Sequence, residues 1–247
     1  MENSIYIGLS KQVAVRNQMD LIANNIANMS TPGYRAQNMV FSEYINKSPA
    51  NPDVPVKDDI SQVLDYGHYQ NTEAGPMKQT GNPTDVALNG PGYFGVQTPE
   101  GVLYTRAGNF QLNVEGQLVT GTGDPVADQG GGEIVIPDDS TEIRIDRNGV
   151  IANQDGEIAQ LMIVEFADEQ LLEATGNGLY RAPEGAVNAE AENTVAMQGM
   201  LESSNVNPII EMTRMIDVLR SYQKTQQMLS DEHDRQKDMI GRLSRSN

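Results

Sequence analysis

Six residues, Gly90-Pro91-Gly92-Tyr93-Phe94-Gly95, match letter for letter the glycine pattern of a dinucleotide-binding loop. In such a loop the glycines follow a strand and open a helix, whose N-terminus meets the pyrophosphate. Here the pattern leads into YFGVQTPEG, an apolar run followed by a turn, which predicts a strand in place of the helix. We therefore expect turn glycines between strands and no cofactor-binding residue.

Other side chains that could do chemistry are poorly arranged for it. Asp58-Asp59 and Asp138-Asp139 lack the alternate-position spacing of a calcium loop, and a solvated acidic face is the better explanation. Ser203 and Ser204 belong to no nucleophile-elbow pattern and have no histidine at a readable spacing. The sequence predicts no catalytic and no metal-binding residue, so we do not expect an enzyme.

Composition narrows the class of protein further. The 247 residues contain no cysteine, which excludes disulfides and thiolate metal sites, and the two histidines, His68 and His233, stand alone. No apolar run is long enough to span a membrane. The first residues, MENSIYIGLSKQ, lack the basic-then-apolar order of a Sec signal. We expect a protein that stays in the cytosol or is exported by a route without a cleaved signal.

The net charge of −17 is unevenly distributed. Residues 1–40 hold three Lys/Arg and two Asp/Glu, and residues 208–247 hold seven and six, so each end carries +1. The middle holds seven and twenty-six, which makes −19. An acidic middle argues against binding to a nucleic-acid backbone and keeps an exposed body soluble, whereas near-neutral ends suit close packing.

Helical spacing marks the N-terminal end of the chain. Residues 1–29 are predicted to form a helix, which Pro32 and Gly33 end. In steps of four and three its large apolar residues form one narrow stripe of coiled-coil type, which consists of Ile5, Val15, Met19, Ile22, Ile26 and Met29. For an isolated helix, packing on the chain's own core is the ordinary explanation of such a stripe.

A second heptad pattern runs over more than four heptads at the C-terminal end. Its apolar members include Met212, Met215, Leu219, Tyr222 and Leu229. A pattern of this length favours a coiled coil over a core helix. We expect Asn207 to cap this helix and Pro208 to occupy its first turn.

Between the helices the periodicity changes. Residues 46–60 hold three prolines and few large apolar groups, which predicts an extended loop. From about Thr84 to Ala182 short apolar runs alternate with Gly-rich turns, and Asn148-Gly149 is a hairpin signal. This pattern predicts an antiparallel β domain, barrel-like or sandwich-like.

The sequence therefore predicts an α+β protein, in which two terminal heptad helices pair as an antiparallel coiled coil and the β domain is inserted between them. We expect an N-terminal helix in residues 1–35, an extended linker in 36–79, an acidic β-rich outer domain in 80–200 and a C-terminal coiled-coil helix in 201–247. The first and last of these segments should pair with each other.

Three long segments resemble a known family. NNIANMSTPGYR (24–35) and LESSNVNPIIEMTRMIDVLRSYQ (201–223) are similar to the paired terminal signatures of bacterial flagellar rod and hook proteins. The central segment TGNPTDVALNGPGYFGVQTPEGVLYTRAGNFQLNVEGQLVTGTGDPV (80–126) resembles the β segment of the same family. The segments stand in the family's order, which makes the resemblance specific.

The resemblance implies a structural subunit of the flagellar basal-body rod, which assembles helically and transmits motor torque to the hook. Residues 3–12, 64–76 and 104–113 look most like proximal rod proteins, and a distal rod protein is the alternative. Implied partners are copies of this chain, other rod proteins and the flagellar type III export apparatus, without nucleic acid, cofactor or membrane span. The implied location is the periplasmic rod of the basal body. From another class, a secreted β-domain binding module that oligomerises through its terminal helices stays open.

We expect the interface between subunits to include both heptad stripes and one polar flank. Asn24, Asn25 and Asn28 lie together on a second flank of the first helix. Amide groups both donate and accept, so we expect this flank to contact a neighbouring subunit; a solvated face is the alternative. Its expected counterparts are Asn205 and Asn207. The full predicted interface is Ile5, Val15, Met19, Ile22, Asn24, Asn25, Ile26, Asn28, Asn205, Asn207, Met212, Met215, Leu219, Tyr222 and Leu229.

Overall fold

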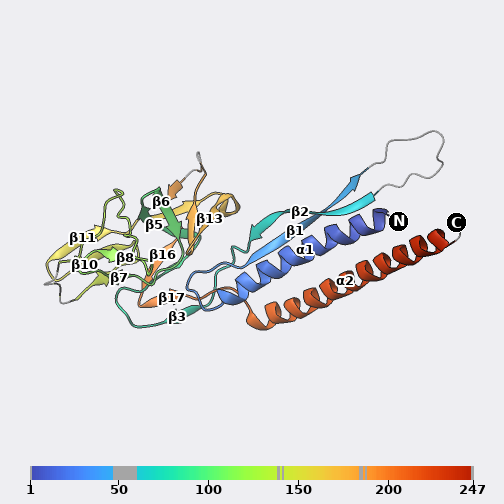
Figure 1. Cartoon of the computed structure of the whole chain (residues 1–247). Helices are drawn as coiled ribbons and strands as arrows, with labels where there is room; N and C mark the ends of the chain where they lie inside the picture. Colours follow the sequence, from blue (N-terminus) through green and yellow to red (C-terminus); the bar gives the residue numbers. More distant parts are fainter. Residues whose placement is uncertain are drawn as a thin grey trace. The chain divides into compact units, whose positions relative to one another are not determined.

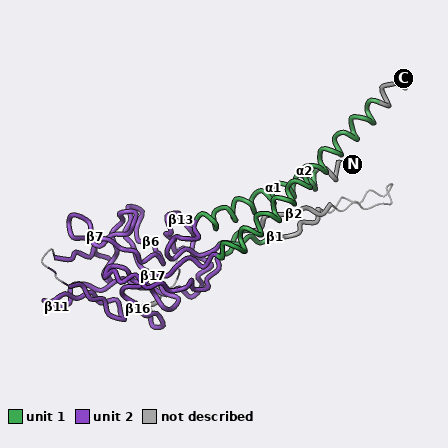
Figure 2. The backbone as a smooth tube through the Cα atoms, turned by 90° about the horizontal axis from the view of Figure 1, so that it is seen from below, with its two compact units in different colours: residues 1–27, 37–69, 207–247 green, residues 28–36, 70–206 purple. Residues whose placement is uncertain are grey.

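The computed structural model describes residues 2–46, 60–137, 140, 142–183, 186 and 188–245 of the chain. The chain forms two compact units, which Figure 2 draws in different colours. Unit 1 consists of residues 1–27, 37–69 and 207–247, and unit 2 of residues 28–36 and 70–206. Unit 2 thus includes short segments, 28–35 and 201–206, that the sequence assigned to the helical ends.

Unit 1 holds the two terminal helices, α1 (Glu2–Ala27) and α2 (Pro208–Arg245), which lie side by side (Figure 1). Gly8 of α1 faces Leu229 of α2, whereas Asn25, near the other end of α1, reaches Glu211. The helices therefore run antiparallel, and the predicted α+β fold with paired terminal helices is confirmed. Among the helices in the described residues, none combines the length and the apolarity needed to cross a membrane.

The described part of unit 1 also contains two strands, β1 (Gln37–Asn46) and β2 (Ile60–Gln70), which pair with each other in opposite directions (Figure 1). β1 also contacts α1. These strands occupy a region that the sequence predicted as extended linker. The three prolines that suggested a linker all fall between the strands, in residues 47–59, which lie outside the described part of the chain.

The beginning of α2 is capped as predicted. Oδ1 of Asn207 accepts hydrogen bonds from the backbone N–H groups of Ile209 (3.1 Å) and Ile210 (3.3 Å). Pro208 occupies the first helical position, where its missing N–H group costs no hydrogen bond. The local sequence therefore fixes where this helix starts.

Unit 2 is built from short antiparallel strands, and the predicted antiparallel β region is confirmed. Its strands are β3 (Met77–Gln79), β4 (Val86–Asn89), β5 (Gly92–Thr98), β6 (Gly101–Thr105), β7 (Gln111–Leu112), β8 (Leu118–Val119), β9 (Arg144–Ile145), β10 (Val150–Asn153), β11 (Gly156–Gln160), β12 (Ile163–Phe166), β13 (Glu173–Gly176), β14 (Leu179–Arg181), β15 (Asn188–Glu190), β16 (Val195–Gln198) and β17 (Met200–Glu202). The largest described sheet has the order β13-β14-β6-β5-β12-β15, and a three-stranded sheet has the order β11-β10-β9. Two-stranded sheets pair β16 with β4, β17 with β3 and β7 with β8.

Turn residues set the hairpins of unit 2. β9 and β10 join across Asn148-Gly149, where Gly149 has φ +80° and the Asp146 carboxylate accepts from the N–H groups of Asn148 and Val150. One core cluster consists of Val86, Leu88, Phe94, Phe110, Leu118, Val126, Ile134, Ile136, Ile145, Ile151, Leu161 and Ala196. A second, mainly aromatic cluster consists of Tyr93, Tyr104, Phe166, Leu172 and Tyr180.

Candidate subunit interface

Much of the predicted helical stripe packs within a single copy of the chain. Val15 and Ile22 of α1 are buried against Val218 of α2. Nε2 of Gln12 donates to the Tyr222 hydroxyl (3.1 Å) beside them. The predicted interface residues that pack around this cluster are Met19, Ile26, Met215 and Tyr222. These side chains hold α1 to α2 inside one copy.

The heptad pattern of α2 separates into two faces. The face toward α1 follows steps of four and three through Glu211, Met215, Val218, Tyr222, Thr225 and Leu229. Met212 and Leu219, which the sequence placed on the same stripe, are 50% and 42% exposed. The polar groups on the inner face are hydrogen-bonded: Glu211 accepts from Nδ2 of Asn25 (3.4 Å), and the Thr225 hydroxyl donates to a backbone carbonyl. The sequence pattern had merged these two faces.

Each helix also carries an apolar stripe that is largely exposed in the described part of the chain. The α2 stripe is 42–76% exposed and consists of Ile209, Met212, Ile216 and Leu219. The α1 stripe is 51–58% exposed and consists of Tyr6, Leu9 and Val13. The side chain of Ile5, predicted in this interface, lies outside the described side chains. Open apolar residues at helical spacing are typical of a surface that another helix covers.

The asparagine flank of α1 is partly occupied by the chain itself. Asn25 is buried, and its amide pairs with the backbone of Gln37 at the start of β1: Nδ2 donates to the carbonyl (2.8 Å) and Oδ1 accepts from the N–H (3.0 Å). Asn24 is exposed and Asn28 half-buried. The amide of Asn25 thus joins α1 to β1, and a contact of this flank with a neighbouring subunit stays a prediction, carried by Asn24 and Asn28.

The two asparagines predicted as counterparts of this flank, Asn205 and Asn207, hydrogen-bond to backbone groups of their own chain. Nδ2 of Asn205 donates to the carbonyls of Asn71 (3.0 Å) and Glu73 (2.8 Å), and its Oδ1 accepts from the N–H of Ala36 (2.7 Å). Asn207 caps α2. Local spacing could reveal the cap but not the role of Asn205, because its partners are remote in the sequence.

A buried ion cluster lies inside unit 2. Glu202 lies between two arginines, and at most 2% of each of the three side chains is exposed. Its Oε1 is 3.1 Å from Nη2 of Arg35, and its Oε2 is 2.8 Å from Nη2 of Arg106. The N–H of Gly75 donates to Oε1 (2.9 Å), and the N–H of Gly33 donates to the Glu202 carbonyl (2.8 Å). Burial lowers the pKa of Arg106, whereas the charge of Glu202 acts in the opposite direction.

The glycine pattern at residues 90–95 forms part of the socket for Arg106. Nη1 of Arg106 donates to the carbonyls of Gly90 (2.8 Å) and Gly92, and its guanidinium carbon is 5.6 Å from the centroid of the Tyr93 ring. A Cβ atom on Gly92 would lie 2.8 Å from the Thr194 side chain. The residues after Pro91 form β5, as the sequence predicted. The carbonyls of Gly90 and Gly92 therefore bind a buried guanidinium, and the missing side chain of Gly92 allows close packing against Thr194.

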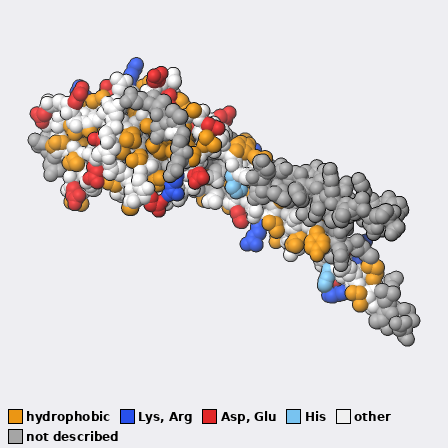
Figure 3. Space-filling model, turned by 90° about the horizontal axis from the view of Figure 1, so that it is seen from above, with side chains coloured by type: hydrophobic (Ala, Val, Ile, Leu, Met, Phe, Trp, Pro, Cys, Tyr) orange, Lys and Arg blue, Asp and Glu red, His pale blue; other side chains and the backbone are white. Residues whose placement is uncertain are grey.

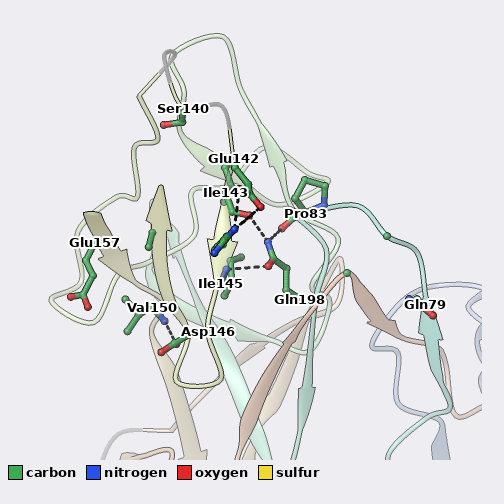
Figure 4. A pocket seen from close by; sticks show the side chains of 14 residues that line it. Gln79, Pro83, Ser140, Glu142, Ile143, Ile145, Asp146, Val150, Glu157 and Gln198 are labelled. Atoms are coloured by element: carbon green, nitrogen blue, oxygen red, sulfur yellow. Dashed lines mark hydrogen bonds and ion pairs between the residues drawn. The ribbon is translucent and has the colours of Figure 1, made fainter. Parts of the chain in front are cut away.

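A groove of about 940 Å³ opens beside β9 in unit 2 (Figure 4). The amide of Gln198 in this groove is bound to the chain: Nε2 donates to the carbonyls of Pro83 and Ile143 (both 2.8 Å), and Oε1 accepts from the N–H of Ile145 (3.2 Å). The Gln198 side chain thereby hydrogen-bonds to the backbone of Ile145 in β9, which lies at the edge of its sheet. Within the described residues, no group of three or more His, Cys, Asp or Glu could hold a metal ion. Two acidic pairs considered above lie outside those residues, Asp58-Asp59 and Asp138-Asp139.

Three family models match the chain in the order of its elements. The model described as flagella basal body rod protein matches residues 5–35, which include most of α1. The flagellar hook protein FlgE/F/G D1 domain matches residues 87–153 in unit 2. The flagellar basal body rod FlgEFG protein C-terminal model matches residues 197–242, which include most of α2.

Curated relatives match over nearly the whole length. The flagellar basal-body rod protein FlgF of Caulobacter vibrioides is 34% identical over 249 positions, which cover 100% of both chains. FlgF of Rhizobium meliloti is 31% identical over 233 positions, which cover 94% of this chain and 93% of the relative. FlgG of Bacillus subtilis is 33% identical over 256 positions, which cover 94% of this chain and 96% of the relative. The chain therefore belongs to the FlgE/F/G family of flagellar basal-body rod proteins, and it is a structural rod protein, not an enzyme.

Proposed function

We propose that this protein is a proximal rod subunit of the FlgF type, which packs its terminal helices against copies of itself and other rod proteins in a helical tube. The observation that carries the proposal is the pair of open apolar stripes on α1 and α2. The described part of a single copy leaves both stripes largely exposed to water, whereas burial stabilises by roughly 25 cal/mol per Å² of apolar surface. Many such contacts would give the tube the stiffness that transmission of motor torque to the hook requires.

The alignments favour FlgF over FlgG. The alignments with the two FlgF relatives are about as long as the parts of this chain that they use, so they open few gaps in this chain. The alignment with FlgG extends over 256 positions but uses 94% of 247 residues, so FlgG carries residues that this chain lacks. A distal rod protein is the second candidate, because the identities to FlgF and FlgG are similar.

The proposed location is the periplasmic rod, reached through the flagellar type III export apparatus. A chain without cysteine suits this route, because no disulfide can form in a chain that is threaded unfolded. The visible face of unit 2 carries scattered acidic side chains (Figure 3). Such a surface suits solvated lateral contacts between neighbouring subunits.

Complementation tests this proposal. In a non-motile deletion strain that lacks its own proximal rod protein, the unsubstituted chain is expected to restore rods and swimming. Leu219→Asp, on the α2 stripe, should leave export and the β fold intact but prevent assembly, whereas Lys224→Asp, at an exposed position off the stripe, should still assemble. Swimming restored by Leu219→Asp would contradict the assembly surface. Complementation only of a strain that lacks the distal rod protein would assign the second candidate instead.

A further inference from the structure

We propose that Asn177, which precedes Gly178, is a site of spontaneous covalent modification, where the side-chain amide is lost and the residue becomes aspartate or isoaspartate. The reaction needs no enzyme and no cofactor, and its second reactant is water. The proposal concerns a hairpin of unit 2 and does not depend on the proposed rod function.

The reaction begins at the backbone. The Gly178 nitrogen attacks Cγ of Asn177 and loses its proton, and the amide nitrogen leaves as ammonia, so that a five-membered succinimide ring closes. Water then adds to one of the two ring carbonyls and breaks its bond to the ring nitrogen. Addition at Cγ gives aspartate, and addition at the backbone carbonyl gives isoaspartate. Glycine favours the first step because no Cβ atom hinders its nitrogen.

The structure distinguishes Asn177-Gly178 from the two other Asn-Gly pairs of the sequence, Asn89-Gly90 and Asn148-Gly149. Asn177 and Gly178 form the two-residue loop between β13 and β14, and the flanking residues Gly176 and Leu179 pair with each other. The φ angles of Asn177 (+53°) and Gly178 (+74°) are those of a type I′ turn. The hydrogen bond of such a turn joins its first and fourth residues. The N–H of Gly178, the third residue, therefore takes no part in it.

Backbone conformation and open space also favour ring closure at Asn177. Among the described residues, Asn177 is the one non-glycine residue with a positive φ, a conformation that side chains rarely adopt. Its side chain is exposed, and a Cβ atom on Gly176 would meet nothing within 4 Å. The Thr105 hydroxyl donates to the carbonyl of Gly178 (2.8 Å), not to its nitrogen. The loop can therefore rotate to bring the nitrogen onto Cγ.

The pair Asn148-Gly149 is held in a different kind of turn. Gly149 is the fourth residue of the turn that begins at Asp146, and its N–H donates to the Asp146 carbonyl (3.1 Å). The Asp146 carboxylate also accepts from the N–H of Asn148 (2.8 Å), and Gly149 is buried. Ring closure at Asn148 therefore requires that the hydrogen bond of the attacking nitrogen breaks first.

The pair Asn89-Gly90 is held by strand pairing. Asn89 ends β4 and is paired with Val195 of β16. The carbonyl of Gly90 accepts from the buried guanidinium of Arg106 (2.8 Å). Both contacts oppose the backbone rotation that ring closure needs, so Asn89 should react only after local opening.

Mass spectrometry of the purified full-length chain, incubated in mildly alkaline buffer, tests the proposal. Cleavage after glutamate separates the three pairs into peptides 74–100, 143–157 and 174–184. Loss of the amide adds ~1 Da, because OH replaces NH₂. We expect this gain first in peptide 174–184, at least about fivefold faster than in 143–157, where a hydrogen bond must break. In oxygen-18 water the product should gain one heavy oxygen atom, and an isoaspartate methyltransferase should label part of it.

Two matched variants and a denatured sample are the controls. Asn177→Gly keeps a residue suited to the turn and should abolish the gain in peptide 174–184, whereas Asn148→Gly should leave that gain unchanged. In denaturant all three peptides should react at similar rates. Conversion of Asn148 or Asn89 in the folded chain as fast as Asn177 would overturn the proposal. Conversion of Asn177 only in denaturant would overturn it as well, and so would a product without isoaspartate.

Discussion

Arg35 and Glu202 lie 3.1 Å apart, Nη2 to Oε1, with 2% and 1% of their side chains exposed. Arg35 belongs to the segment STPGYR that follows α1, and Glu202 ends β17, shortly before α2. One carboxylate therefore joins the two segments of unit 2 that lead from the terminal helices, and it holds Arg106 from β-domain residues at the same point. Buried charges that are paired and hydrogen-bonded can persist in the interior, but they depend strongly on one another.

Glu202→Ala is expected to destabilise unit 2 by ~3–5 kcal/mol, because it leaves two guanidinium groups buried without their shared anion. Glu202→Gln should cost less, since its carbonyl can still accept a hydrogen bond. Denaturant unfolding followed by tyrosine fluorescence measures both losses in a chain without tryptophan. The control is Glu142→Ala, which removes a solvent-exposed partner of Arg144 and should leave the midpoint unchanged. Equal midpoints for Glu202→Ala and Glu142→Ala would refute a structural role for the buried cluster.

Gly33→Ala tests whether the segment after α1 is held against the β strands. Gly33 has φ +67°, and a Cβ atom there would lie 2.4 Å from the Arg106 carbonyl carbon. The left-handed backbone alone costs a non-glycine residue of order 1 kcal/mol, and the backbone overlap adds to it. We expect a lower unfolding midpoint together with faster tryptic cleavage at Arg35.

Gly81→Ala is the matched control for Gly33→Ala. Gly81 has a similar φ of +75°, but nothing lies within 4 Å of its added Cβ atom. Its loss of stability should therefore report the backbone strain without the overlap. If the two variants lose the same stability and are cleaved at the same rate, close contact at Gly33 has no energetic role.

Two adjacent residues separate the contacts inside a copy from the proposed contacts between copies. Val218 is 8% exposed and packs on α1, whereas Leu219 is 42% exposed on the α2 stripe. Val218→Asp buries an unpaired charge and should therefore lower the helix content measured by circular dichroism. Leu219→Asp should leave the helix content of one copy unchanged. Equal loss of helix content in both variants would contradict the separation of the two faces.

The same two residues show why the sequence predicts the helices better than their surfaces. Spacing and capping residues suffice for the existence of α2 and for its start at Pro208. The apolar residues alone do not show which side of α2 faces α1, because the polar residues Glu211 and Thr225 also lie on that side, where they are hydrogen-bonded. Sequence periodicity therefore assigned Leu219 to the inner face of α2. In the structure its neighbour Val218 lies on that face instead.

The partners of Asn25 and Arg106 lay beyond the reach of sequence patterns for a different reason. Asn25 pairs with the first residue of β1, in a region whose prolines suggested a linker. Arg106 and Glu202 meet only when segments remote in the sequence pack together, and no local spacing reports that contact. Local chemistry predicted turns, caps and the antiparallel β region, whereas contacts between distant segments required the structure.

The pH dependence of stability should report the burial of Tyr180. Burial raises the pKa of the Tyr180 hydroxyl to about 12, although the hydrogen bond that its oxygen accepts from Gln70 acts in the opposite direction. Because the folded pKa lies above the unfolded value of ~10, the unfolded chain loses this proton first as the pH rises. The contribution of Tyr180 to the free energy of unfolding is complete below pH ~10 and decreases between pH ~10 and ~12, by ~2–3 kcal/mol in total.

The variant Tyr180→Phe lacks this titration, so the stability difference between the unsubstituted chain and the variant should shrink over that range. Denaturant unfolding followed by tyrosinate absorbance measures this difference. Parallel pH profiles for Tyr180→Phe and the unsubstituted chain would contradict the raised pKa.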